Sequence, residues 1–86
     1  MTETAEARLK RLHMRSMRRG IKEMDILLSR FAAAELAGMD GPALDLYDAL
    51  LWENDQDLLV WVTGQQPAPD RYRALVARIA AVPPVD

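Results

Sequence analysis

Apolar residues recur along this chain every three or four positions, which is the period of an α-helix. No stretch alternates apolar and polar residues with a period of two, so strands are not expected. We predict an all-α fold, a small five-helix bundle that forms a single domain over residues 1–86, with 83–86 as a loose tail. The predicted helices span about 4–18, about 21–37, Pro42 to before Asn54, Asn54 to Gly64, and Asp70 to before Pro83.

Cap and turn residues separate these helices. Thr2 or Thr4 is expected to cap the first helix, Asp40 or Gly41 the third, and Asn54 the fourth, because such residues accept hydrogen bonds from the free N–H groups of a first turn. Gly38 and Gly64 are expected to end the second and fourth helices. Trp61 lies among apolar neighbours, so we predict that it is more buried than Trp52.

Gly20 interrupts what would otherwise be one helix from about residue 5 to residue 37. Glycine inside a helix costs roughly 1 kcal/mol relative to alanine. Gly20 is interpreted either as a left-handed cap at a corner between two helices, or as a corner that also lets another molecule's backbone approach. In purely structural terms, the neighbouring cations would end one helix and the neighbouring acids would begin the next: Arg15, Arg18, Arg19, Glu23 and Asp25.

The composition excludes several kinds of site. The chain has no cysteine, so it has no disulfide, zinc–thiolate site or thiol nucleophile. His13 is the single histidine, which rules out a multi-histidine metal site within one chain, and we predict neither a metal site nor catalytic residues. The longest apolar run, Leu58 to Val62, is far below the roughly 20 residues that cross a bilayer, so no membrane insertion is expected.

The acidic start of the chain, with Glu3 and Glu6, resembles neither a secretory signal nor an Arg-rich targeting peptide. We therefore expect a cytoplasmic bacterial protein. Charge is distributed unevenly: residues 1–30 hold eight Lys or Arg against four Asp or Glu, and residues 31–70 hold eight acids and no Lys or Arg. This asymmetry fits either steering of a partner or ordinary solvated helix faces.

The segment Arg19-Gly20-Ile21-Lys22-Glu23 fits the pattern RGxxE. Together with Asn54-Asp55-Gln56-Asp57-Leu58-Leu59-Val60-Trp61, an acidic pair followed by Leu and Trp, it resembles the SdhE family of assembly factors of succinate dehydrogenase. The resemblance covers roughly Arg11 to Tyr72, and the order of the two blocks makes it more specific than five residues alone.

The resemblance implies a factor, not an enzyme, that binds the flavoprotein subunit of succinate dehydrogenase, with fumarate reductase as a further candidate. The factor would promote covalent attachment of FAD to a histidine of that partner. The chemistry would be the partner's own, attack of its histidine on the 8α carbon of the flavin, with negative charge developing on the ring system. We expect a monomer that binds no FAD stably by itself and binds no nucleic acid.

The same resemblance implies a partner-binding site in the RGxxE segment. Arg19 would present its planar fork to a carboxylate or carbonyl of the partner, Gly20 would permit close approach, and Glu23 would accept hydrogen bonds or orient Arg19. The remaining candidate residues of this site are Arg18, Ile21 and Asp25. The second block is assigned a structural role, with Asp55 and Asp57 as helix-capping acids and Trp61 beside them.

Two other binding functions fit parts of this sequence. Two helices that meet at a glycine corner among arginines could mimic a helix-turn-helix, but the sequence pI of about 5.3 and the acidic middle disfavour nucleic acid. A toxin-neutralising role has been attached to members of this family, and the sequence does not separate it from flavin attachment.

Overall fold

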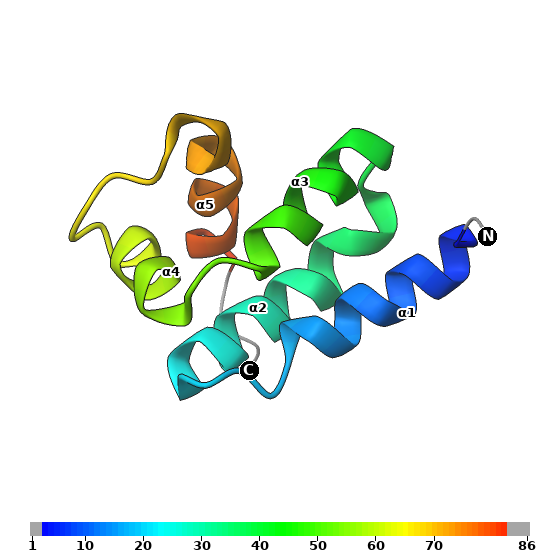
Figure 1. Cartoon of the computed structure of the whole chain (residues 1–86), viewed down its shortest axis with the longest axis horizontal. Coiled ribbons are helices and arrows are strands. Elements are labelled where there is room, and N and C mark those ends of the chain that lie inside the picture. The colour runs from blue at the N-terminus through cyan, green and yellow to red at the C-terminus, as the bar shows by residue number, and fades with distance from the viewer. Residues whose placement is uncertain (1–2, 83–86) are drawn as a thin grey trace.

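The computed structural model describes residues 3–82, and all regular structure in that range is helical (Figure 1). The longer helices are α1 (Ala5–Ser16), α2 (Lys22–Glu35), α3 (Gly41–Leu51), α4 (Asp55–Val62) and α5 (Arg73–Ala80). Two short 3₁₀ turns, η1 (Leu36–Gly38) and η2 (Asp70–Tyr72), follow α2 and precede α5. The predicted all-α class and the order of five helices are confirmed.

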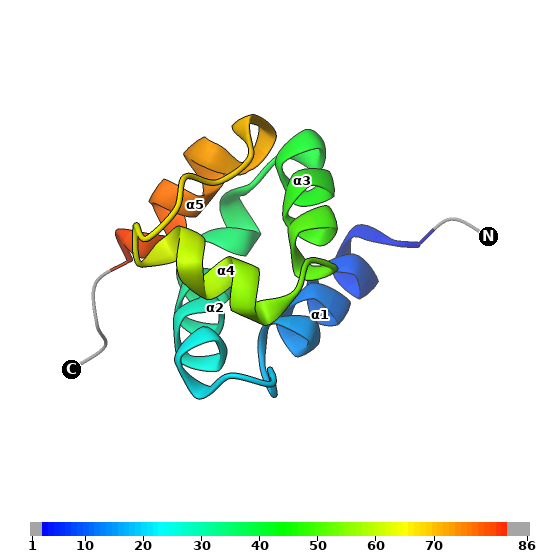
Figure 2. The same cartoon turned by 60° about the vertical axis from the view of Figure 1, so that its left-hand side comes forward.

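Helix α2 lies at the centre of the arrangement and packs against α1, α4 and α5. Helix α1 also contacts α3, and α4 contacts α5, so the chain wraps around α2 in sequence order (Figure 1). Figure 2 shows α4 crossing over α2. This crossing brings the start of α4 to the end of α2 that adjoins the Gly20 corner.

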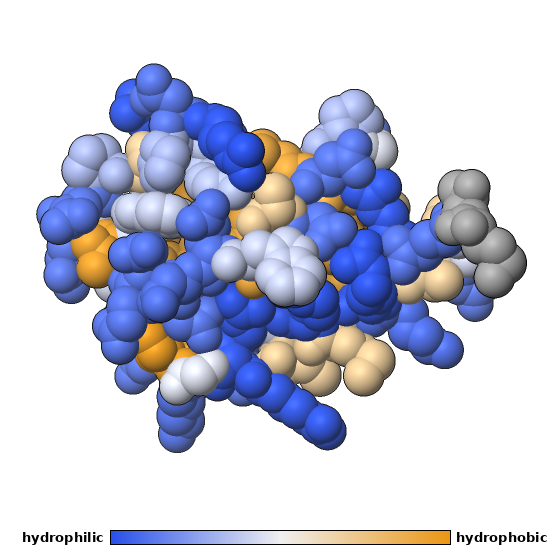
Figure 3. Space-filling view, in the orientation of Figure 1, coloured by the Kyte–Doolittle hydropathy of each residue, from blue (hydrophilic) through white to orange (hydrophobic). Residues whose placement is uncertain are grey.

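The core forms where the apolar stripes of the helices meet. Phe31 of α2 and Tyr47 of α3 are fully buried, and their ring centroids lie 5.3 Å apart. Further fully or almost fully buried side chains come from all five helices and both 3₁₀ turns: Leu12, Met24, Leu28, Leu36, Leu50, Leu51, Leu58, Tyr72 and Ile79. On the face seen in Figure 3, apolar colouring appears in small separate areas, as expected when these stripes point inward.

Most of the predicted caps are confirmed. The Ala7 N–H donates to Thr4 Oγ1 at 3.0 Å, the Ala43 N–H to Asp40 Oδ1 at 2.9 Å, and the Gln56 N–H to Asn54 Oδ1 at 2.7 Å. Gly64, at a φ of 79°, follows α4 in the left-handed conformation. Trp61 is half-buried and Trp52 is exposed, as predicted. Thr2 and the tail at 83–86 lie outside the described residues.

Two predicted helix ends are wrong. The first helix stops at Ser16 instead of Arg18, because Met17 is extended, with a φ of −110° and a ψ of 168°. The second stops at Glu35 and tightens into η1, so Gly38 lies in a 3₁₀ turn and does not adopt the left-handed conformation expected of a cap.

A buried polar pair lies where α1 ends. The Ser16 Oγ donates to the carbonyl of Leu12 at 2.7 Å, and the Tyr47 hydroxyl lies 2.5 Å from the same Oγ. Because the Ser16 proton is engaged, the Tyr47 hydroxyl is the donor of the second bond. Burial raises the pKa of Tyr47 to about 12, above its ordinary value of about 10.

We expect this tyrosine to make the fold sensitive to alkali. Since the folded-state pKa is raised, the neutral hydroxyl contributes its full stability below pH ~10. That stability is lost as the pH rises from 10 to 12, by about 2–3 kcal/mol. Urea unfolding followed by circular dichroism should show a shallower loss over this range for Tyr47→Phe than for the unaltered chain. Parallel losses in the two proteins would contradict the assignment.

Candidate functional site

The RGxxE segment begins in the α1–α2 loop, residues 17–21. After the extended Met17, Arg18 adopts a positive φ of 58°, so the left-handed residue of the corner is Arg18. The prediction that Gly20 is the left-handed cap is therefore wrong. Because Ser16 is fixed in the core and Met17 is extended, the chain reverses at the residue that follows them. This conformation costs a non-glycine residue roughly 1–2 kcal/mol.

Arg19 directs its fork into the molecule. Its Nε and Nη2 donate to Asp55 Oδ1 at 3.0 and 2.7 Å, and its Nη1 and Nη2 donate to the carbonyls of Arg15 and Leu51 at 2.9 and 3.1 Å. The Arg19 side chain is 11% exposed and that of Asp55 is 17% exposed. The chain itself therefore occupies the donors that the resemblance assigns to a partner, and Arg19 as a partner contact stays a prediction.

Asp55 uses its second oxygen to hold the loop backbone. The Gly20 N–H donates to Asp55 Oδ2 at 2.9 Å, so one carboxylate binds both the side chain of Arg19 and the peptide of Gly20. We call these three groups the Arg19–Asp55 clamp. Asp55 is the first residue of α4, but Asn54 provides the cap. Asp55 therefore does not cap α4 as predicted, and its carboxylate holds the α1–α2 loop instead.

Gly20 is exposed and lies outside the left-handed region. A Cβ at this position would meet Asp55 Oδ2 at 3.5 Å, an ordinary van der Waals contact. Neither the backbone conformation nor the packing within the chain therefore requires glycine here. This favours the second interpretation of the corner, in which glycine leaves room for another molecule.

The other candidate residues lie around Gly20 at the start of α2. The side chains of Arg18 and Glu23 are exposed and make no hydrogen bond or ion pair with other described residues. Ile21 packs against the core and occupies the cap position of α2, where it provides no side-chain acceptor for the first N–H groups. Asp25 is half-buried and accepts from the Ser29 hydroxyl at 3.3 Å. Arg18 in the loop and Glu23 in the first turn of α2 are thus exposed on either side of Gly20, whose N–H is held by Asp55.

A further set of interactions escaped the sequence analysis. Along α1 and the loop, arginines recur at spacings of three and four residues and face aspartates of α3 and α4. We call these arginines the arginine stripe. Their ion pairs are Arg8–Asp45, Arg11–Asp48 at 2.9 Å, Arg15–Asp48 at 3.6 Å and Arg19–Asp55 at 2.7 Å.

These pairs bring cations of the basic start of the chain together with acids of its middle. The basic start of the chain neutralises part of the acidic middle within the molecule, a possibility that the charge count alone left out. The hydrogen bond from Arg11 is the main reason that the pKa of the Asp48 carboxyl lies below its usual value. The signal that could have found the stripe was the helical spacing of these arginines, read together with that of Asp45 and Asp48.

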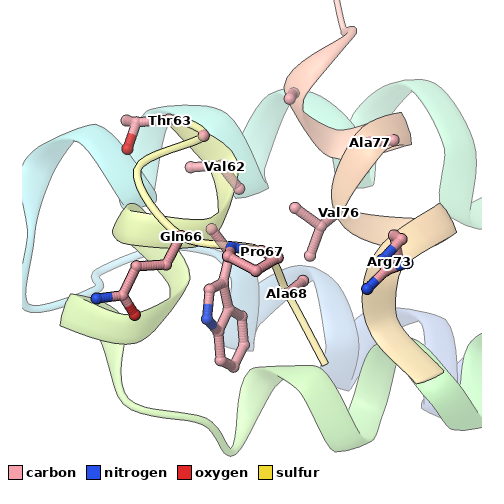
Figure 4. Close-up of a pocket in the computed structure, with 11 residues that line it drawn as sticks. Val62, Thr63, Gln66, Pro67, Ala68, Arg73, Val76 and Ala77 are labelled. Atoms are coloured by element: carbon pink, nitrogen blue, oxygen red, sulfur yellow. The ribbon is translucent and has the colours of Figure 1, made fainter. Parts of the chain in front are cut away.

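The rest of the second block lies apart from the loop. Asp57 is exposed, and Trp61 is half-buried with its ring centroid 6.0 Å from that of Tyr72. Trp61 also lines an open hollow of about 520 Å³ between α4, the following connector and α5. Figure 4 shows Pro67 and Ala68 of the connector opposite Val76 of α5. Arg73 is the one charged residue among those that line it, so the hollow offers no pair of groups for acid–base chemistry.

Within residues 3–82, no group of three or more His, Cys, Asp or Glu side chains is placed to hold a metal ion. No helix in this part of the chain is long and apolar enough to cross a membrane.

Comparison with known proteins identifies the family. Residues 10–83 match the family model described as flavinator of succinate dehydrogenase. The chain belongs to this family. The flavinator family is the one that the RGxxE segment and the second block indicated, so the resemblance is confirmed.

Curated relatives in three yeasts carry the name succinate dehydrogenase assembly factor 2, mitochondrial. The chain is 42% identical to the Schizosaccharomyces pombe protein over 72 residues, which are 84% of this chain and 52% of that protein. It is 43% identical over 76 residues to the Candida glabrata protein, covering 85% and 50%, and 45% identical over 74 residues to that of Meyerozyma guilliermondii, covering 83% and 55%. The chain spans about half the length of these relatives.

These relatives correct one expectation. We expected a cytoplasmic bacterial protein from the acidic N-terminal residues, whereas the relatives are fungal proteins named as mitochondrial. The expectation is withdrawn, because the composition of a few N-terminal residues says nothing about the compartment in which the folded domain works.

The clamp yields a prediction about stability. Asp55→Ala should lower the free energy of unfolding by about 2–4 kcal/mol, because it leaves the largely buried guanidinium of Arg19 without its carboxylate. Asp57→Ala is the matched control, an exposed acid in the same first turn, and should cost no more than about 1 kcal/mol. Chemical unfolding of both variants decides the matter, and equal losses would show that the clamp adds nothing beyond an ordinary first-turn acid.

Proposed function

We propose that this chain binds the flavoprotein subunit of succinate dehydrogenase and promotes covalent attachment of FAD to it. Membership of the flavinator family supports this proposal, as do relatives that are named assembly factors of succinate dehydrogenase. The fumarate reductase flavoprotein is a second candidate partner, because it would present the same kind of subunit. In this proposal the chain acts as a monomer and is an assembly factor, not an enzyme.

The observation that carries the proposal is the exposed Gly20 peptide beside Glu23, on a loop that the Arg19–Asp55 clamp holds in place. A protein partner can approach the backbone at Gly20 because this residue is exposed and has no side chain of its own, although its N–H is held by Asp55. Glu23 then accepts hydrogen bonds from donors of the partner, and Arg18 supplies an exposed positive charge. Since the loop is fixed before binding, little conformational entropy is lost on association.

In the proposed mechanism the partner supplies the nucleophile and FAD supplies the electrophilic carbon. This chain holds the flavoprotein subunit in the conformation that reacts. Its exposed polar groups, Arg18, Lys22 and Glu23, contact the partner around Gly20. FAD stays bound to the partner in this proposal, and the chain has no stable FAD site of its own.

The helix-turn-helix alternative loses support from the arginine stripe. Arg15 and Arg19 counted toward a basic surface for nucleic acid, but both are engaged by aspartates of the chain. Phosphate binding depends on cations that are free to replace counterions. No observation favours the toxin-neutralising alternative over flavin attachment.

Co-expression with a succinate dehydrogenase flavoprotein subunit tests the proposal. Covalent flavin is read as fluorescence of the subunit band after a denaturing gel, with and without this chain. We expect the chain to raise the signal. Glu23→Ala and Gly20→Gln should reduce that gain at least tenfold, because one removes an acceptor and the other fills the approach to the backbone.

Both variants should unfold within about 1 kcal/mol of the unaltered chain, since Glu23 is exposed and Gly20 needs no special φ. Gly38→Gln is the matched control, at an exposed glycine with no atom within 4 Å of an added Cβ, and should leave the signal intact. Full flavin attachment with folded Gly20→Gln and Glu23→Ala would remove the site assignment. No gain from the unaltered chain would remove the proposed function.

A further inference from the structure

Trp52 follows the last residue of α3 and is 76% exposed. The other exposed large apolar side chains are less so: Met14 at 63%, Met17 at 44% and Ile26 at 40%. Tryptophan has the largest apolar side chain, so leaving it in water forgoes more burial than any other residue would. Nothing in the core explains why a tryptophan stands at this position.

The indole is nevertheless held in place. The Arg15 guanidinium lies over the Trp52 ring, 4.0 Å from its centroid, a distance typical of a cation–π contact. Arg15 is itself fixed, because its Nη2 donates to the Leu51 carbonyl at 3.2 Å and its Nη1 lies 3.6 Å from Asp48 Oδ1. One face of the indole is therefore covered by a positioned cation, and most of the ring surface remains open to a partner.

Trp52 adjoins the candidate site. The Leu51 carbonyl, one residue before it, accepts hydrogen bonds from both Arg15 and Arg19, so it joins the indole's support to the Arg19–Asp55 clamp. The exposed ring and the Gly20 peptide are thus attached to one hydrogen-bonded unit. A protein that docks on Gly20 meets the α3–α4 connection, because Leu51 and Asp55 on either side of Trp52 are bonded to Arg19 and Gly20.

We propose that Trp52 is an anchor residue of the partner-binding surface and enters an apolar pocket on the flavoprotein subunit that docks at Gly20. This inference rests on the proposed function. A large apolar ring that is already held in one orientation gains burial on binding and loses little side-chain entropy. Energetic hot spots of protein interfaces are enriched in tryptophan for this reason.

Binding of the purified flavoprotein subunit, followed by titration calorimetry, tests the anchor. Trp52→Ala should raise the dissociation constant at least tenfold, because it removes the group that fills the pocket. Its unfolding midpoint should stay close to that of the unaltered chain, since Trp52 is mostly exposed. Gln66→Ala, an exposed residue of the connector before η2, is the control and should bind like the unaltered chain.

A fluorescence readout identifies what covers the ring. In a Trp61→Phe background, Trp52 is the single tryptophan of the chain. Its emission should shift to shorter wavelength when FAD-free flavoprotein subunit is added. The subunit's own tryptophan emission is measured separately and subtracted. Quenching by FAD alone would show that the ring stacks on flavin, and a shift with chain concentration alone would show that a second copy covers it. Either result would overturn the inference.

The anchor role of Trp52 and the proposed function can fail separately. If the unaltered chain binds the subunit and Trp52→Ala binds within twofold of it, the anchor is wrong while the proposed function stands. If the unaltered chain does not bind the subunit at all, the proposed function fails first.

Discussion

The ion pairs between the arginine stripe and the aspartates of α3 and α4 determine how α1 and the α1–α2 loop are placed against α3 and α4. They become more buried toward the loop, from the exposed Arg8–Asp45 pair to the largely buried Arg19–Asp55 pair. Exposed pairs contribute about 0–1 kcal/mol each, so the outer members guide alignment more than they stabilise it. Removing one partner of the innermost pair should cost the most, because the other charge would be left largely buried without its partner.

This constraint divides the RGxxE segment into two kinds of residue. Arg19 faces inward and determines the shape of the loop, whereas Gly20 and Glu23 face outward and are free to contact a partner. The left-handed conformation of Arg18 fits the same scheme. A strained backbone persists only where surrounding contacts determine it, and here the clamp on one side and the buried Ser16 on the other provide them.

Local signals made much of the fold predictable. Thr4, Asp40 and Asn54 cap helices as expected because a cap depends only on the next two or three residues. The corner itself was misplaced by two residues, since glycine is the usual left-handed residue and Gly20 was the obvious choice. Arg18 takes that conformation between residues that α3 and α4 hold on either side, and no local pattern reveals those contacts.

The candidate site was predictable only as a set of positions. The RGxxE pattern located Gly20 and Glu23, which the structure leaves exposed, but it offered Glu23 as the group that orients Arg19, whereas Asp55 accepts its hydrogen bonds. Asp55 lies 36 residues away in the chain, and its carboxylate meets Arg19 only after α4 has packed on α2.

That separation couples the shape of the loop to completion of the fold. Closing a segment of this length costs chain entropy that only packing of α3 and α4 on the first two helices offsets. A nascent or partly folded chain that has formed α1 and α2 carries every residue of the RGxxE segment, yet it lacks the carboxylate that sets the loop. The α1–α2 loop therefore reaches the shape described here only after the middle helices have docked, and a partner that selects this shape would engage only such molecules.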